Sequence, residues 1–124
     1  MIELKNTPPS DTDVETTYIV QPPDTNMHGT AFGGWLMSKM DLTAAICASR
    51  HAKASCVTVS VDNLQFNKPI NLGDIVVIKA RVNHVGKTSM EVGLKVYKEK
   101  THPNGLYREH CLSGYFTFVN VNKD

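Results

Sequence analysis

The chain lacks any strong excess of charge of one sign. Its 124 residues carry 13 Lys and Arg against 12 Asp and Glu, a formal net charge of +1. Binding to nucleic acid or to an anionic membrane surface usually needs a basic patch or a clear basic excess. The balance therefore gives no reason to expect nucleic acid or a membrane as a partner.

Long apolar runs and patterned cysteines are also missing. No run approaches the ~20 residues of a membrane-spanning helix, and the start, MIELKNTPPS, lacks the basic and apolar regions of a secretory signal. We expect a cytoplasmic protein. Cys47, Cys56 and Cys111 are odd in number and without metal-ligand spacing, which favours buried reduced thiols over a nucleophilic cysteine, the alternative. We expect no metal and no bound organic cofactor.

The length and the apolar pattern predict a single domain, residues 1–124, of the α+β class. Residues 1–12 are polar, contain proline and are expected to be mobile. Alternating and β-branched residues predict five strands, with one helix between the first and the second. The strands span residues 14–21, 56–66, 75–85, 88–100 and 106–121. Short connections between the last four strands favour an antiparallel sheet.

Alternation within the strands predicts which side chains share a face. In the second strand, Val57, Val59 and Val61 are expected on one face. Thr58 is then expected on the opposite, polar face. In the fourth strand, one face is lined by apolar residues at alternate positions. These are Met90, Val92, Leu94 and Val96.

Residues 24–51 form a glycine-punctuated loop that runs into the only helix pattern. At ~100° per residue, the apolar side chains of this helix fall into two arcs. The first arc holds Leu36, Met37, Met40, Ala44, Cys47 and Ala48. The second arc holds Trp35, Leu42 and Ile46. A helix that is apolar on two sides is typical of a buried helix. Asp41 lies at the border of the first arc, so we do not expect it to point freely into water.

The loop before the helix offers hydrogen-bond donors. Gly29, Gly33 and Gly34 allow another group to approach the backbone closely. The first helical turn has unpaired N–H groups and the positive end of the dipole, which can polarise a carbonyl. Asn26 adds a side-chain amide. The alternatives are tight packing at the glycines, and an Asx-type turn or a helix-approach cap at Asn26.

One helix cannot supply both donors and a base to one substrate atom. Gly34 and Asp41 are separated by a rise of roughly 10 Å along a helix, whereas a base acts within about 3 Å of its proton or through one water. We infer a site shared by two copies of the chain, with Asp41 from one copy and the loop donors from the other. The alternative for Asp41 is a carboxylate bonded to nearby backbone or paired with a lysine.

The chain resembles the hotdog-fold acyl-CoA thioesterases, in particular the bacterial cytosolic acyl-CoA hydrolases and the repeated domains of the brain-type enzyme. The resemblance depends on the order and spacing of several short matches across nearly the whole chain. In chain order, the matches are Asp24-Thr25-Asn26, Gly29, Phe32-Gly33-Gly34, Met40-Asp41, His51, Val57-Thr58-Val59, Phe66, Gly73-Asp74 and Gly86-Lys87-Thr88-Ser89-Met90-Glu91.

This resemblance implies one long central helix wrapped by an antiparallel sheet of about five strands. It also implies hydrolysis of acyl-CoA to a fatty acid and CoA at a dimer interface, with Asn26 and Asp41 as catalytic residues. Asp41 either activates water or attacks the thioester itself, and both routes need the same placement. The implied assembly is a homodimer at minimum and a homohexamer, a trimer of dimers, with CoA lying across subunit contacts.

Further positions are candidates for holding water or CoA. The hydroxyl of Thr58 could hold the attacking water, or it could be a solvated or packed threonine. The turn Gly86-Lys87-Thr88-Ser89 offers N–H groups, hydroxyls and an ammonium, a fair cradle for the phosphates of CoA. Its alternative is a polar hairpin turn. Lys68 and Arg81 could assist, while His51 at the helix end is expected to be structural.

Two other functions fit the same resemblance. A hotdog hydratase or dehydratase would act on an enoyl or hydroxyacyl group, but the His-Phe-Pro-Gly stretch of those dehydratases is absent. A non-catalytic acyl-CoA-binding protein would need none of the chemistry of Asp41. The length of the preferred acyl chain depends on how side chains meet across the interface.

Overall fold

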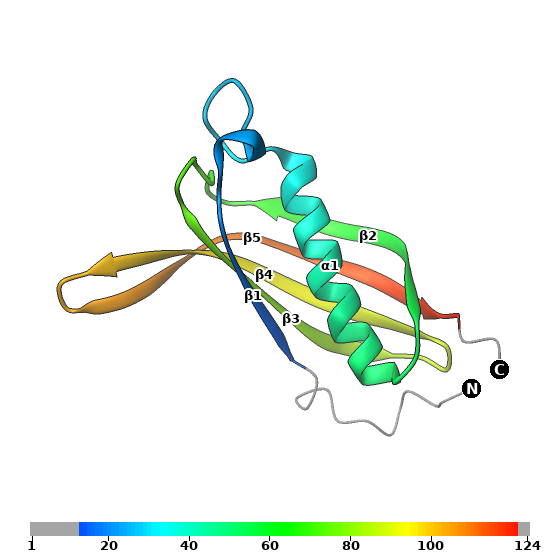
Figure 1. Ribbon diagram of the computed structural model, residues 1–124. Helices are drawn as coiled ribbons and strands as arrows, with labels where there is room; N and C mark the ends of the chain where they lie inside the picture. Colours follow the sequence, from blue (N-terminus) through cyan, green and yellow to red (C-terminus); the bar gives the residue numbers. More distant parts are fainter. Residues whose placement is uncertain (1–12, 122–124) are drawn as a thin grey trace.

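The computed structural model describes residues 13–121, so the expected mobility of residues 1–12 lies outside the described residues. Five strands and one long helix occur in the predicted order (Figure 1). Their bounds are β1 Val14–Ile19, a 3₁₀ turn Pro22–Asp24, α1 Gly33–Ala52, β2 Cys56–Phe66, β3 Ile75–Val85, β4 Ser89–His102 and β5 Gly105–Asn120. The helix ends where Lys53 adopts a left-handed conformation and its N–H donates to Ser49 O at 2.8 Å.

The sheet is antiparallel throughout and has the strand order β1-β3-β4-β5-β2. Strands β1 and β2 neighbour each other in sequence but lie at opposite edges, because α1 carries the chain across one face of the sheet (Figure 1). The strand β2 pairs with β5 on one side. Within residues 13–121, no strand pairs with the other edge of β2. The backbone N–H and C=O groups on this edge can therefore pair with a further strand.

The core lies between α1 and the face of the sheet that the helix covers. The first predicted arc of the helix is confirmed, since its central members Met40, Ala44 and Cys47 have no exposed surface. The second arc is only partly buried within one chain: Trp35 packs against the core, but 55% of Leu42 and 40% of Ile46 is exposed. The expectation of a helix buried on both sides is therefore wrong for the single chain, and an uncovered apolar stripe remains.

The predicted alternation in β2 is wrong because the strand contains a bulge. Its register with β5 shifts between Thr58 and Ser60, and an extra residue at such a point reverses the faces that follow. Thr58 is opposite Phe118 and Val61 is opposite Phe116, and both phenylalanines belong to the core. The side chain of Thr58 therefore points toward the helix rather than into a separate polar face.

The stretch His102-Pro103-Asn104-Gly105 predicts a turn through its Asn-Gly dipeptide, and the structure has this turn between β4 and β5, with Gly105 at φ 130°. Both strands reach closer to the turn than predicted, because the ladder continues to the pair His102 and Gly105. The end of this hairpin projects beyond the layer formed by the helix and the rest of the sheet (Figure 1).

Candidate functional site

The centre of the site is a hydrogen bond between the helix and the edge strand. Thr58 Oγ1 donates to Asp41 Oδ1 at 2.5 Å, and both residues are half-buried. Within residues 13–121, no lysine and no backbone group bonds to this carboxylate, which removes the structural alternative considered for Asp41. The second carboxylate oxygen keeps its accepting capacity for a water or a substrate.

Asn26 lies in the loop that precedes α1, where its side chain organises the backbone. Its Oδ1 accepts from the N–H of His28 at 2.9 Å and of Thr30 at 3.3 Å, and its Nδ2 donates to Thr30 Oγ1 at 2.8 Å. This is the Asx-type arrangement considered as an alternative. An amide nitrogen carries two hydrogens, so the exposed Asn26 still has one N–H to offer.

The start of α1 presents backbone donors to solvent. Phe32 is the N-cap residue, and no side chain caps the first turn. Gly33 and Gly34 are exposed, and a Cβ added at Gly33 would meet nothing within 4 Å. A ligand can therefore approach Gly33, at the positive end of the helix dipole, whereas the Phe32 ring lies close to Gly34.

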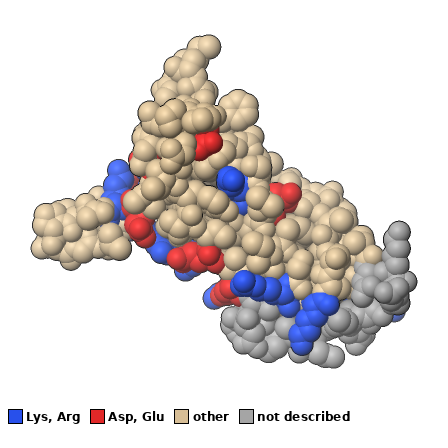
Figure 2. Space-filling model, viewed as in Figure 1, with Lys and Arg blue, Asp and Glu red and all other residues tan. Residues whose placement is uncertain are grey.

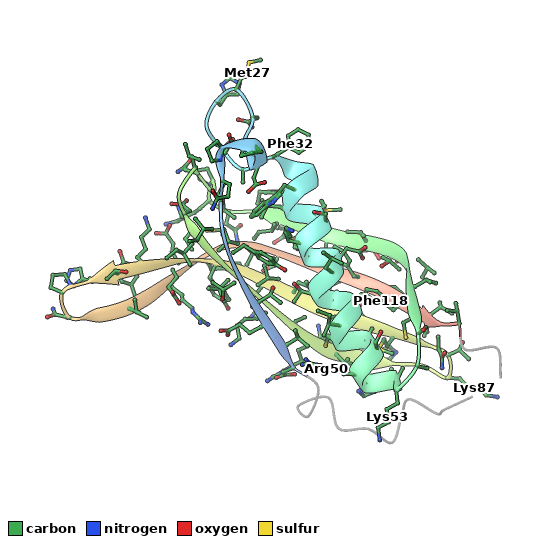
Figure 3. All side chains as sticks on the ribbon, viewed as in Figure 1. Met27, Phe32, Arg50, Lys53, Lys87 and Phe118 are labelled. Atoms are coloured by element: carbon green, nitrogen blue, oxygen red, sulfur yellow. The ribbon has the colours of Figure 1, made fainter. Side chains whose placement is uncertain are left out.

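The structure brings the candidate residues together in two groups rather than one. Asp41 and Thr58 form one group at the middle of α1. Asn26, Gly33 and Gly34 form the other around the start of the helix, near the labelled Met27 and Phe32 (Figure 3). Asp41 lies seven helical residues beyond Gly34, a rise of roughly 10 Å, so a single chain does not place both groups on one substrate atom.

The residues expected to bind CoA are divided in the same way. The turn 86–89 lies at the end of the molecule where the helix stops, as the labels of Lys87 and Lys53 show (Figure 3). Lys68 comes before the start of β3, whereas the turn follows the end of that strand. The ammonium of Lys68 forms an ion pair with Glu109, Nζ to Oε2 at 3.3 Å. Within a single chain Lys68 and this turn therefore lie apart, and their parts in CoA binding stay predictions.

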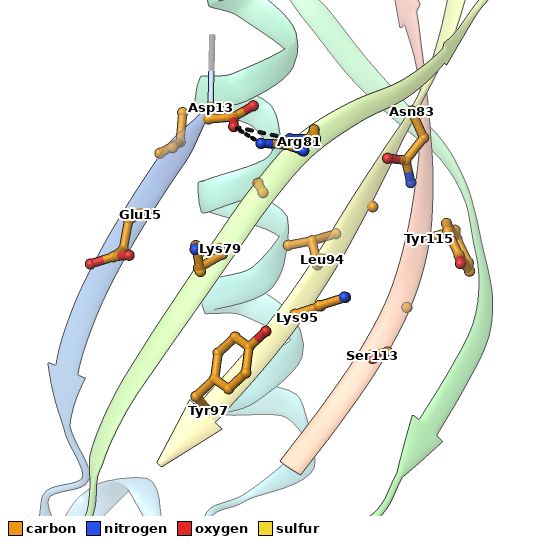
Figure 4. Close-up of a pocket in the computed structure, with 14 residues that line it drawn as sticks. Asp13, Glu15, Lys79, Arg81, Asn83, Leu94, Lys95, Tyr97, Ser113 and Tyr115 are labelled. Carbon is orange, nitrogen blue, oxygen red and sulfur yellow. Dashed lines mark hydrogen bonds and ion pairs between the residues drawn. The ribbon is translucent and has the colours of Figure 1, made fainter. Parts of the chain in front are cut away.

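A separate groove of about 540 Å³ lies on the other face of the sheet (Figure 4). Lys79, Lys95 and Ser113 lie opposite one another across its strands. Arg81 is held there by Asp13, with Nε and Nη2 to Oδ2 at 3.0 and 2.6 Å. Within one chain Arg81 therefore lies on the face of the sheet away from the helix, and its help in CoA binding stays a prediction. The groove contains none of the candidate catalytic residues, so we do not assign the site to it.

The distribution of charge and the state of the cysteines bear on which kinds of site the described residues can form. Most of the side seen in Figure 2 carries neither Lys, Arg, Asp nor Glu; some Lys and Arg side chains lie at the end where the helix stops, and others lie elsewhere on this side among Asp and Glu. Among residues 13–121 there is no cluster of three metal-binding side chains, and no helix there is long and apolar enough to cross a membrane. Burial raises the pKa of Cys47 to about 11 and also raises the pKa of Cys56. Protonated thiols make poor nucleophiles.

Comparison with known proteins identifies the family. A profile of the Thioesterase superfamily matches residues 28–103, more than half of the chain. The chain belongs to the thioesterase superfamily. Among its relatives, the acyl-CoA thioester hydrolase YciA of Salmonella typhimurium is 36% identical to this chain. The alignment of 126 residues covers 100% of this chain and 92% of YciA.

Solved structures of thioesterases show the same fold. The acyl-CoA hydrolase of Staphylococcus aureus in complex with butyryl coenzyme A has a TM-score of 0.88 and 38% identity, covering 93% of this chain and 69% of that one. A hexameric hotdog fold thioesterase of Campylobacter jejuni has a TM-score of 0.79 and 34% identity, covering 88% and 83%. The predicted hotdog fold and the resemblance to acyl-CoA hydrolases are therefore confirmed.

Two residues around this thioesterase site were missed in the sequence. Thr30 completes the bonds of Asn26, and its only signal is a position four residues after the asparagine. Lys98 is buried beneath the neighbouring loop. Lys98 continues the alternating face of Met90 and Val96 by one further step, so the period could have placed it inside the protein.

Proposed function

We propose that this thioesterase hydrolyses acyl-CoA to a free acid and CoA at a site made by two copies of the chain. The observation that carries the proposal is the bond between Thr58 and Asp41. It holds a carboxylate beside the uncovered apolar stripe of the helix and the unpaired edge of β2. A carboxylate that is oriented at an incomplete surface is suited to act on a substrate bound between two subunits.

In this mechanism Asp41 brings about attack on the thioester carbon, either by water or by its own carboxylate. As a base, it takes a proton from water while the water oxygen bonds to the carbonyl carbon. As a nucleophile, it forms an anhydride that water then hydrolyses. In either route the carbon–sulfur bond breaks, the sulfur leaves as thiolate and is protonated, and one water is consumed. Thr58 keeps one carboxylate oxygen in place, so that the other faces the substrate. No metal or organic cofactor takes part in either route.

The second copy supplies the groups that stabilise the carbonyl oxygen. If two β2 edges pair across a two-fold axis, the two helices lie side by side in opposite directions. The start of the partner helix then faces the middle of this one. The N–H groups at Gly33 and Gly34 and the spare N–H of Asn26 would approach the thioester carbonyl, where developing negative charge is stabilised by such donors.

The assignment is supported by the Staphylococcus aureus relative. Its structures include single alanine mutants of an asparagine, an aspartate and a threonine that are separated by 15 and 17 positions. Asn26, Asp41 and Thr58 are separated by the same intervals in this chain. Equal spacing of the same three residue types favours equal roles.

The proposal extends to CoA and to larger assemblies. In the antiparallel dimer, the turn Gly86-Lys87-Thr88-Ser89 of one copy lies toward the partner's loop, where it can meet the phosphates. A trimer of dimers, as expected from the hexameric Campylobacter jejuni relative, would add contacts to CoA across subunits. We also propose that the protein is located in the cytoplasm and takes part in fatty acid metabolism.

Mixing of two inactive variants tests the shared site. Asp41→Asn and Asn26→Ala are each expected to lose thiol release from butyryl-CoA. After unfolding and refolding together, mixed dimers contain one site with both changes and one with neither, which restores about a quarter of wild-type activity for random pairing. No recovery, with mixed dimers shown by native mass spectrometry, would contradict the shared site. Crotonyl-CoA consumed without thiol release would instead indicate a hydratase.

A further inference from the structure

Lys98 lies inside the protein, although it is a charged residue. Its side chain is 9% exposed, and it is the only buried Lys, Arg, Asp or Glu among residues 13–121. It is opposite Val76 on β3 and Glu109 on β5, on the face of the sheet that carries the core. A buried ammonium is costly unless it is paired, so its partners explain why it is there.

Two carboxylates approach the ammonium of Lys98. Its Nζ is 3.5 Å from Glu109 Oε1 and 4.0 Å from Asp74 Oδ2. Glu109 also binds Lys68, at the surface. Asp74 belongs to the loop that leads into β3, and its Oδ2 also accepts the N–H of Asn71 at 2.7 Å. Lys98 thus lies within ion-pair distance of the carboxylate that closes this loop.

The loop at 70–74 is the platform for the loop that holds Asn26. Ala31 N–H donates to Ile70 O at 2.6 Å, and Leu72 N–H donates to Gly29 O at 2.9 Å. Asn71 also forms a bridge with Thr30. Thr30 in turn binds the side chain of Asn26. The path from Lys98 to Asn26 thus begins with an ion pair at 4.0 Å and continues from Asp74 through hydrogen bonds and a β-bridge.

We propose that Lys98 is a positioning residue for the hydrolysis, acting through Asp74 and the loop 70–74 on the loop 26–32. This inference rests on the proposed function, because it assigns the loop to the thioester carbonyl. Without the ammonium, Asp74 loses its cation and the platform becomes free to shift. The pair Asp41 and Thr58 lies on other elements and keeps its geometry.

The proposal predicts which kinetic constant changes. Donors that act on developing charge stabilise the transition state more than the bound substrate, so their displacement lowers kcat with little change in KM. For Lys98→Met, which keeps an apolar stem, we expect a fall in kcat of about ten- to a hundredfold, as for an error of about 1 Å in position. Lys98→Arg should restore part of the loss.

The experiment measures butyryl-CoA hydrolysis and amide hydrogen exchange in parallel. Lys95→Met, an exposed lysine on the same strand, is the matched control and should behave as the wild type. In Lys98→Met, exchange should accelerate in residues 26–32 and 70–74 but not in the middle of α1. A purely structural role would lower the melting temperature without this local pattern and without the selective loss of kcat.

A second variant keeps the test valid if Lys98→Met fails to fold. Asp74→Asn, at a partly exposed carboxylate, should show the same selective loss, and adding Lys98→Arg should not deepen it. The inference is overturned if Asp74→Asn and any folded Lys98 variant match Lys95→Met in kcat and exchange. If the wild-type protein releases no thiol, the proposed function fails instead, and the exchange pattern alone then decides whether Lys98 holds the loop.

Discussion

The two apolar arcs of α1 have similar chemistry but opposite surroundings. Met40, Ala44 and Cys47 are completely covered by the sheet, whereas Leu42 and Ile46 face outward from the single chain. The first arc therefore stabilises the fold, and the second remains to stabilise an assembly. Asp41 lies at their border, half-buried, so a carboxylate is held where folding and association meet.

The sharpest way to break this comparison is to place the same charge in each arc. Ala44→Glu puts an unpaired carboxylate into the core and is expected to cost about 4 kcal/mol or more, enough to abolish the folded state. Ile46→Glu, two residues along on the other arc, should keep a cooperative fold. Thermal unfolding followed by circular dichroism checks both. Equal melting temperatures would show that the arcs do not differ.

At the border between the arcs, Asp41→Asn should abolish most of the hydrolysis while the protein remains folded. Loss of a base or nucleophile lowers kcat by a factor of about 10² to 10⁴, while the amide can still accept from Thr58. Thiol release and calorimetric binding of CoA measure the two properties separately. Full turnover by this variant would contradict the assignment of Asp41.

The outer arc should fail at association rather than at folding. Leu42→Asp combined with Ile46→Asp is expected to cost at least about 2 kcal/mol of dimerisation and to yield a folded, inactive monomer. Light scattering after size exclusion gives the mass. Leu106→Asp is the control, because Leu106 is similarly exposed but lies on the projecting hairpin. A doubly substituted protein of unchanged mass would show that the arc is not an interface.

The bond that connects the strand to the border residue can be tested alone. Thr58→Val removes the donor to Asp41 and is expected to lower kcat about tenfold, the value of roughly one hydrogen bond to a charged group. Thr58→Ser keeps the hydroxyl and should retain most activity. Steady-state kinetics with butyryl-CoA decide. Equal activity of the valine and serine variants would remove Thr58 from the site.

The buried arc should also give a small dependence of stability on pH. Burial raises the pKa of Cys47 from 9.0 to about 11. Below pH 9 the thiol is protonated in both states, so its contribution is complete; between pH 9 and about 11 the unfolded chain ionises first, and about 2 to 3 kcal/mol of stability is lost. Urea unfolding of the wild type and Cys47→Ala across this range measures the difference. Parallel curves would contradict it.

The sequence was informative where a pattern repeats without interruption. The order of the elements, the first arc of α1 and the turn at Gly105 were predicted from periodicity and turn chemistry. The side on which Thr58 lies was not, because an extra residue in β2 reverses the alternation and leaves no mark in the sequence. The exposure of Leu42 was missed because periodicity reports apolar faces but not what covers them.

The sequence allowed the residues of the candidate site to be named, but not their contacts with one another. Asp41 and Thr58 were both named, but their direct bond depends on the bulge that turns Thr58 toward the helix. The roles assigned to Asn26, Gly33 and Gly34 stay predictions, because they need a second copy. Lys98 was overlooked because a charge usually indicates a surface position, and only its tertiary partners explain its burial.

The strand order has a consequence for how the polypeptide reaches its native state during synthesis. The strand β1 pairs with β3, and β2 pairs with β5, the last strand among residues 13–121. Both margins of the sheet thus wait for later segments, and closing such long loops slows folding. Until β5 is synthesised, the growing chain exposes apolar helix surface and unpaired strand edges, which favour aggregation.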